Sequence, residues 1–319
     1  MRDLGVVVGS LPTGPLNAIT DVPGVWVGQT TIATGDLNTG VTAIVPPGYA
    51  DGLPAAVAVG NGYGKLVGST QVDELGVIET PILLTGTLSV FRVADALVGW
   101  LLDRDPEATS LNPVVGETND RFLSDIRRRP ITPEHVHAAL DSASSDLPAE
   151  GCVGAGTGTA ALGFKAGIGT ASRVVEHGTV GALVQSNFSG LLTVLGTPIP
   201  AEPIDAEGNS CMIVVATDLG VDARQLGRLA RRAIFALARV GSDYAPGSGD
   251  YAIAFTTRRG VFADRDLREP FQAVTESVEE ALLNSLTMAH TTTGYGGNTA
   301  HAVPHDLIRA LTTGSGRAS

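Results

Sequence analysis

The stretch Gly208-Asn209-Ser210-Cys211-Met212-Ile213-Val214-Val215 indicates both the architecture and the chemistry of this chain. A turn-forming pair, Gly208-Asn209, precedes Ser210, which therefore occupies the first position of an expected strand. The run from Met212 to Ala216 is continuously apolar, which is typical of a strand that is covered on both faces. We therefore expect a buried strand that begins with a serine.

Ser210 is well placed to attack the peptide bond that precedes it. Cleavage of that bond would divide the chain into residues 1–209 and 210–319 and would leave Ser210 with a free amine. Such an amine can act as the base for the hydroxyl of its own residue, which is the N-terminal-nucleophile arrangement. A second polar cluster, Ser248-Gly249-Asp250, opens another apolar run further along the chain.

The composition narrows the class of protein. The length of 319 residues and the hydrophobic content of 43% suit a single domain over residues 1–319 with a sizeable core. The net charge of −12 argues against a nucleic-acid partner, which would need a basic surface. The sequence contains neither a membrane-spanning run nor the apolar core of a signal peptide. Two cysteines do not suggest a disulfide framework, so we expect a soluble cytoplasmic protein without a membrane partner.

Hydrophobic spacing predicts the order of the secondary structure. Helices are expected over 89–103, from Thr132-Pro133 onward, over 222–240 and over 271–289. Strands are expected at 42–45, 55–59, 179–184, 212–216 and 251–256. Strands in both halves, followed by helices in blocks, predict an α+β protein with layers of helix outside two packed sheets.

Blocks in a fixed order along nearly the whole chain carry a family resemblance. They are Ile19–Val25, Thr39–Ile44, Glu79–Thr85, Val114–Asp120, Gly151–Gly158, Val184–Phe188, Val215–Asp218 and Ser248–Asp250. These blocks resemble the DmpA-type family, the L-aminopeptidase D-Ala-esterase/amidases, which include the β-peptidyl aminopeptidases. The resemblance implies a four-layer αββα sandwich, which is also the fold of ornithine acetyltransferases. It further implies a precursor that cuts itself between Asn209 and Ser210.

The same resemblance implies roles for individual residues. Asn187 would donate a hydrogen bond to the tetrahedral oxyanion, and Ser248 with Asp250 would orient the nucleophile. The family often has glutamate where Asp250 stands, so this side chain is one methylene shorter. Glu117, assisted by Asn119, would hold the ammonium group of the substrate as a lone carboxylate, which would restrict the enzyme to free N-termini. The resemblance also implies a homotetramer of processed protomers and neither a metal nor a cofactor.

Three other motifs have competing interpretations. Cys211 could rival Ser210 as a nucleophile, but neighbouring strand residues point to opposite faces, and we expect Cys211 to be a small buried hydrophobe. Gly154-Ala155-Gly156-Thr157-Gly158 resembles part of a dinucleotide-binding fingerprint but has the wrong spacing, so a glycine-rich backbone near a substrate or against a packed sheet explains it better. His135 and His137 lie two apart in an expected helix, where they cannot face one another as metal ligands.

These observations favour a self-processing serine aminopeptidase, amidase or esterase. It would release N-terminal residues from short peptides, amides or esters through an acyl-Ser210 intermediate. An acyltransferase of the ornithine acetyltransferase type is an alternative, because only the acceptor of the acyl group differs. A binding relative with an inactive site is the non-enzymatic alternative. The sequence does not rank L-, D- and β-amino acid substrates.

Overall fold

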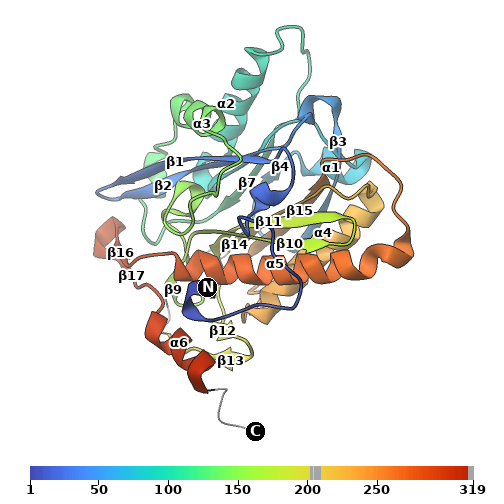
Figure 1. The fold of residues 1–319 in the computed structure, drawn as a ribbon. Coiled ribbons are helices and arrows are strands. Elements are labelled where there is room, and N and C mark those ends of the chain that lie inside the picture. The colour runs from blue at the N-terminus through green and yellow to red at the C-terminus, as the bar shows by residue number, and fades with distance from the viewer. Residues whose placement is uncertain (202–203, 205–209, 315–319) are drawn as a thin grey trace.

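Two mixed β-sheets lie face to face at the centre of the molecule, with helices on both outer sides (Figure 1). The structure, a computed structural model, describes residues 1–201, 204 and 210–314. The first sheet has the strand order β1 (Trp26–Thr34), β2 (Leu37–Val45), β6 (Ile82–Gly86), β7 (Val114–Thr118) and β4 (Leu66–Val67). The second has the order β10 (Ile168–Val175), β11 (Gly178–Asn187), β14 (Ser210–Thr217), β15 (Gly249–Thr256), β3 (Leu53–Gly62) and β5 (Val77–Ile78).

Each sheet contains one parallel pair, and each pair is joined through a helix. β6 and β7 are parallel and are connected through α2 (Val90–Leu102), while β14 and β15 are parallel and are connected through α4 (Ala223–Arg239). Parallel neighbours need such a crossover, which places the helix on a face of the sheet. α3 (Pro133–Asp141) joins α2 on the first sheet, and α5 (Arg268–Thr287) joins α4 on the second.

Three apolar clusters fill the spaces between these layers. One lies between α2, α3 and the first sheet, one lies between the two sheets, and one lies between the second sheet and α4 with α5. β14 contributes to two of them, since Cys211 and Ile213 face the helices whereas Met212 and Val214 face the first sheet. The predicted αββα sandwich and the predicted burial of both faces of this strand are therefore confirmed.

The remaining elements are short and connect or flank the layers. The further α-helices and paired strands are α1 (Ser69–Leu75), α6 (His305–Gly314), β8 (Ala160–Ala161), β9 (Phe164–Lys165), β12 (Thr193–Val194), β13 (Thr197–Pro198), β16 (Thr292–Thr293) and β17 (Thr299–Ala300). Single 3₁₀ turns occupy Arg2–Leu4, Ile19–Asp21, Tyr49–Asp51, Thr87–Ser89, Ile126–Arg128, Gly154–Gly156, Asp264–Leu267 and Tyr295–Gly297. In the described part of the chain no helix has both the length and the apolarity that a membrane span requires.

The glycine-dense segment after residue 150 packs tightly against the first sheet. A Cβ atom on Gly158 would lie 2.0 Å from the carbonyl oxygen of Asn38, and one on Gly40 would lie 2.4 Å from that of Gly154. Only glycine allows backbones to approach this closely. Close packing against a sheet therefore explains these glycines, which is one of the two explanations that the sequence left open.

The predicted strand at 179–184 is longer in the structure, because β11 continues to Asn187. Its polar end is buried with hydrogen bonds: Gln185 Nε2 donates to the carbonyl oxygen of Thr85 and, at 2.8 Å, to Thr118 Oγ1. The extension matters because Asn187 becomes the register partner of Ser210. Ser210 also pairs with Gly249, which in turn pairs with Gly62, so four strands of the second sheet meet at one end.

Candidate active site

Ser210 is the first residue of β14 and lies at this shared end of four strands. It is buried, and side-chain alternation along the strand places it on the same face as Met212, toward the first sheet. Asn209 lies outside the described residues, so the predicted cleavage bond is not described. The predicted nucleophile thus faces the space between the two sheets.

Cys211 points the other way and belongs to the apolar cluster under α4 and α5. Its side chain is fully buried. Burial, with a smaller effect from the charge of Asp250, raises the pKa of the thiol well above its usual value. A thiol that stays protonated is a poor nucleophile, so the interpretation of Cys211 as a buried hydrophobe is confirmed.

Asp250 lies at the start of β15, Ser248 immediately precedes this strand, and the two side chains are directly hydrogen-bonded. Ser248 Oγ donates to Asp250 Oδ1 at 2.7 Å, and Asn61 Nδ2 donates to Asp250 Oδ2 at 2.9 Å. Burial raises the pKa of Asp250, while these two hydrogen bonds act in the opposite direction. Despite its shorter side chain, Asp250 therefore reaches Ser248, and both of its oxygens accept a hydrogen bond.

Asp250 lies on the helix-facing side of the sheet, since it is the register partner of Cys211 and a Cβ atom on Gly60 would touch both Asp250 and Ile234 of α4. Ser210 lies on the opposite face. The Asp250 carboxylate therefore contacts Ser248, which precedes the strand, from the face opposite to the side chain of Ser210. Asn61 is a third member of this chain of contacts, and the sequence offered no signal for it because it lies on β3.

Asn187 is held in one orientation beside Ser210. Its Oδ1 accepts a hydrogen bond from the backbone N–H of Ala160 at 3.2 Å, and its Nδ2 donates to the backbone oxygen of Asn119 at 3.0 Å. Asn119 therefore approaches the site with its backbone. Its side chain accepts from the backbone N–H of Arg121 within its own turn.

Glu117 is almost fully buried at the end of β7, but it is not a lone carboxylate. Its Oε1 accepts hydrogen bonds from the backbone N–H of Lys65 at 3.0 Å and from Lys65 Nζ at 3.2 Å. Lys65 Nζ also donates to Thr87 Oγ1 at 2.7 Å. Sequence reasoning missed Lys65 because the pairing of β4 with β7 brings together residues far apart in the chain. The expectation of a lone carboxylate is corrected accordingly.

The other oxygen of this carboxylate, Glu117 Oε2, is buried and has no hydrogen-bond partner among residues 1–201, 204 and 210–314. An unpartnered buried carboxylate oxygen is costly, and such groups concentrate at sites that bind something. Asp120 Oδ2 and Gln185 Oε1 share this property within the same described part. Burial raises the pKa of Asp120 to about 7, against an opposing hydrogen bond from Thr39.

Gly64 connects this carboxylate with the end of the second sheet. A Cβ atom on Gly64 would lie 3.2 Å from Glu117 Oε1 and 3.3 Å from the Cα atom of Gly249, which is the register partner of Ser210. The segment from Gly62 to Lys65 thus crosses between the sheets and places Glu117 near the start of β14. A hydroxyl, an amide and a carboxylate therefore gather at one end of the sandwich.

Such a set of groups suits acyl transfer on a substrate that carries an amine. Comparison with known proteins agrees, since the model of the family described as peptidase family S58 matches residues 17–300. The chain belongs to this family. The β-peptidyl aminopeptidase BapA of Sphingosinicella xenopeptidilytica is 40% identical over 97% of this chain and 90% of the relative.

Solved structures show the same relationship. The PH0078 protein from Pyrococcus horikoshii OT3 superposes with a TM-score of 0.94 at 40% identity, covering 99% of both chains. The L-aminopeptidase D-Ala-esterase/amidase from Ochrobactrum anthropi, described as a prototype serine aminopeptidase with a variant of the Ntn hydrolase fold, has a TM-score of 0.92 at 35% identity, covering 100% of this chain and 99% of its own. This S58 peptidase is thus a hydrolase of the aminopeptidase class with that fold.

Proposed function

We propose that this S58 peptidase is a self-processing serine aminopeptidase that uses Ser210 to release N-terminal residues from short peptides, amides or esters. The observation that carries the proposal is the buried, unpartnered Glu117 Oε2 close to the end of the sheet where β14 begins with Ser210. It offers a negative group to an incoming ammonium beside a hydroxyl nucleophile.

Maturation would precede catalysis. Ser210 Oγ attacks the carbonyl carbon of Asn209, the Asn209–Ser210 C–N bond breaks, and the nitrogen of Ser210 keeps the proton that Oγ loses. Water then hydrolyses the ester, which releases residues 1–209 with a new carboxylate and residues 210–319 with a new amine. This amine has an ordinary pKa of about 7.7–8.0, so a useful fraction is neutral near pH 7.

Catalysis would repeat the same chemistry on a substrate. The neutral amine of Ser210 takes the proton of Oγ during attack and returns it to the leaving amine, which leaves an acyl ester on Ser210 Oγ. Water then hydrolyses this ester, releases the N-terminal residue as an acid and restores the hydroxyl. Asn187, which is fixed in orientation by Ala160 and Asn119, would stabilise the oxyanion. Ser248, which is oriented by Asp250 through its 2.7 Å hydrogen bond, would position the nucleophile and its amine.

Glu117 would select free N-termini. Its Oε1 is held by the backbone N–H of Lys65, which fixes the orientation of the carboxylate, and Oε2 would accept the substrate ammonium in a charge-assisted hydrogen bond. Asn119 would assist from the adjoining turn. The small peptide or amide substrate is therefore recognised through its amine and cleaved one residue further on.

Intact-mass measurement on the denatured protein tests the proposal. Wild-type protein should yield two fragments that sum to the 32.7 kDa chain plus one water, with Ser210 as a new N-terminus. Ser210→Ala should remain one inactive chain, whereas Cys211→Ala is the matched control and should process normally. Normal cleavage of the Ser210→Ala protein would contradict the assignment. Adding an amine acceptor during turnover would reveal an acyltransferase, because aminolysis would then exceed hydrolysis.

A further inference from the structure

Lys165 of β9 is a fully buried lysine that the chemistry proposed for Ser210 does not use. Its Nζ donates to the backbone oxygen of Gly156 at 3.2 Å and to the backbone oxygen of Ala166. No carboxylate in the described part of the chain forms an ion pair with this ammonium group. A buried ammonium without a carboxylate partner is costly for folding, which argues that its contacts serve another purpose.

The side chain of Lys165 keeps its positive charge near neutral pH. Burial lowers the pKa of Lys165 to about 8, while Cys152 and, after it, Asp120 act in the opposite direction. A pKa of about 8 leaves most of the side chain protonated at pH 7. Lys165 therefore has the N–H donors of an ammonium group, and backbone carbonyl groups accept two of them.

The two carbonyl groups lie on either side of the hairpin formed by β8 and β9. Gly156 precedes β8 and Ala166 follows β9, so Lys165 closes the hairpin at its base. The backbone closes the same base, since the N–H of Ala166 donates to the carbonyl oxygen of Thr159 at 3.2 Å. Lys165 thus holds together the two ends of one short structural unit.

The turn of this hairpin is strained and needs such support. Leu162 and Gly163 have φ angles of 54° and 83°. The left-handed conformation suits glycine but is unfavourable for leucine, and it persists only where surrounding contacts hold it. A hydrogen bond from the N–H of Leu162 to the carbonyl oxygen of Phe188 at 2.8 Å is one such contact, and the closure at the base is another.

The same hairpin fixes the side chain of Asn187. Ala160 is the register partner of Lys165, and its N–H is the donor to Asn187 Oδ1 at 3.2 Å. With Oδ1 held by the hairpin, the amide keeps its oxygen on that side and its Nδ2 donor on the other. If the hairpin moved, the amide could turn and present its oxygen to an oxyanion, which would be repulsive.

We infer that Lys165 is a positioning residue for Asn187. Its ammonium group closes the β8–β9 hairpin, and the hairpin holds the amide of Asn187 in the orientation that an oxyanion requires. The inference rests on the role proposed for Asn187 and adds a residue that acts through it. Because the oxyanion forms only during the reaction, loss of this positioning should slow turnover and leave substrate binding unchanged.

Lys165→Met tests the inference, because methionine keeps the apolar part of the side chain but has no N–H donor. The kcat of the processed enzyme should fall about 30-fold, with a KM within about twofold of the wild-type value. In an Asn187→Ala background, the same substitution should lower kcat by no more than about twofold, because there is no amide left to orient. Intact mass gives the processed fraction to which kcat refers.

Hydrogen exchange supplies a readout that does not depend on activity. In the Lys165→Met protein, backbone amides of residues 157–166 should exchange about tenfold faster than in the wild type, because the base of the hairpin is opened. Thermal unfolding shows whether the variant is folded. If it is not, Thr159→Val gives a milder test, since Thr159 Oγ1 donates to the same Gly156 carbonyl oxygen at 3.1 Å. Its kcat should fall about threefold with KM unchanged.

Cys152→Ala is the matched control, because it removes a side chain beside the ammonium group but neither of the carbonyl contacts. It should keep the wild-type kcat and the wild-type exchange rates. The inference is overturned by unchanged exchange in the hairpin, by an effect confined to KM, or by the same loss of kcat with and without the Asn187 amide. A wild-type kcat for Asn187→Ala would instead refute the role proposed for Asn187 itself, so the two failures can be told apart.

Discussion

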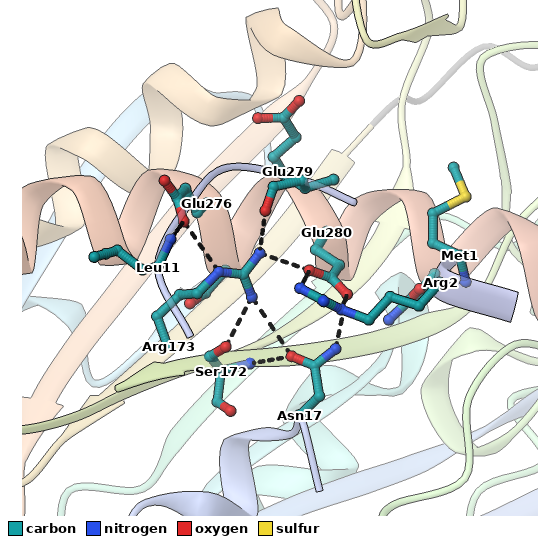
Figure 2. A network of polar contacts seen from close by, with 12 residues as sticks. Met1, Arg2, Leu11, Asn17, Ser172, Arg173, Glu276, Glu279 and Glu280 are labelled. Carbon is teal, nitrogen blue, oxygen red and sulfur yellow. Dashed lines mark hydrogen bonds and ion pairs between the residues drawn. The ribbon is translucent and has the colours of Figure 1, made fainter. Parts of the chain in front are cut away.

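Glu280 and Glu117 are both buried carboxylates that face a cation, but they differ in how many of their oxygen atoms have a hydrogen-bond partner. Glu280 lies in the network around Arg173 of β10, which ties the N-terminal segment to α5 (Figure 2). Glu117 lies at the candidate active site with Lys65. Within the described part of the chain, the first network leaves no buried side-chain polar atom without a partner, whereas the second leaves Glu117 Oε2 without one.

Arg173 shows how completely the first network is satisfied. Its guanidinium donates to Glu276 Oε2 at 3.1 Å, to Glu280 Oε2 at 2.6 Å and to the backbone oxygens of Val8 and Ser172 at 2.8 and 2.7 Å. Burial alone would raise the pKa of Glu280, but hydrogen bonds from Arg2 and the charge of Arg173 outweigh it and hold the pKa below its usual value. This is a structural ion network.

The contrast between the Arg173 network and the Glu117 site separates a structural role from a binding role in this sandwich. A buried charge whose hydrogen bonds are all made contributes to the folded state, whereas a buried oxygen left without a partner is tolerated where a ligand completes it. Substitutions should therefore separate the two sites, with loss of stability at one and loss of activity at the other.

The largest effect expected from a single substitution is a loss of folding stability at Arg173. Arg173→Met leaves Glu276 and Glu280 buried without their main cation, so the free energy of unfolding should fall by about 3–5 kcal/mol in chemical denaturation. Arg224→Met is the control, because Arg224 pairs with Asp264 at the exposed surface, where an ion pair contributes little, and its loss should change the stability far less. Equal losses in the two variants would mean that the Arg173 network is no more than a surface ion pair.

The next effect is at Glu117. Glu117→Gln keeps the shape but removes the charge, so kcat/KM for amino acid amides should fall about 100-fold, or about 2.7 kcal/mol in transition-state stabilisation. Thermal stability should change little. Glu79→Gln is the control, since Glu79 accepts hydrogen bonds from Asn112 away from Ser210 and should retain activity. A variant with normal kcat/KM would remove Glu117 from substrate binding.

A smaller effect concerns pH and Asp120. The pKa of Asp120 is about 7 when folded and about 3.8 when unfolded, so the unfolded state releases its proton first and stability falls as pH rises from about 4 to 7. Asp120→Asn should remove this part of the fall and raise stability at pH 8 by an amount on the order of 2 kcal/mol, with no gain at pH 4. Unfolding curves at both pH values measure this, and an equal gain at pH 4 would exclude titration as the cause.

The smallest effect is at Lys65, whose side chain is 39% exposed. Lys65→Met removes a positive charge beside the proposed ammonium site, so KM for amine-bearing substrates should fall about threefold with kcat unchanged. Lys65→Arg keeps the charge and should retain the wild-type KM. A rise in KM for the methionine variant would show that Lys65 supports substrate binding and does not compete with it.

The sequence alone determined the layers and the position of Ser210. Apolar spacing predicted α2, α4 and α5 to within a few residues, and the continuous apolar run predicted β14 with a serine at its start. These features are local, because helical periodicity and a turn before a strand depend on residues that are close together in the sequence.

Only the tertiary structure decided which residues meet. The register of β11 with β14 sets Asn187 opposite Ser210, the pairing of β4 with β7 sets Lys65 on Glu117, and the alternation along β15 turns Asp250 away from Ser210 toward α4. The Arg173 network likewise joins the N-terminal segment, β10 and α5. Strand register and ion pairing depend on contacts between segments far apart in the chain, and a shift of one residue would reverse every side chain, so no local pattern specifies them.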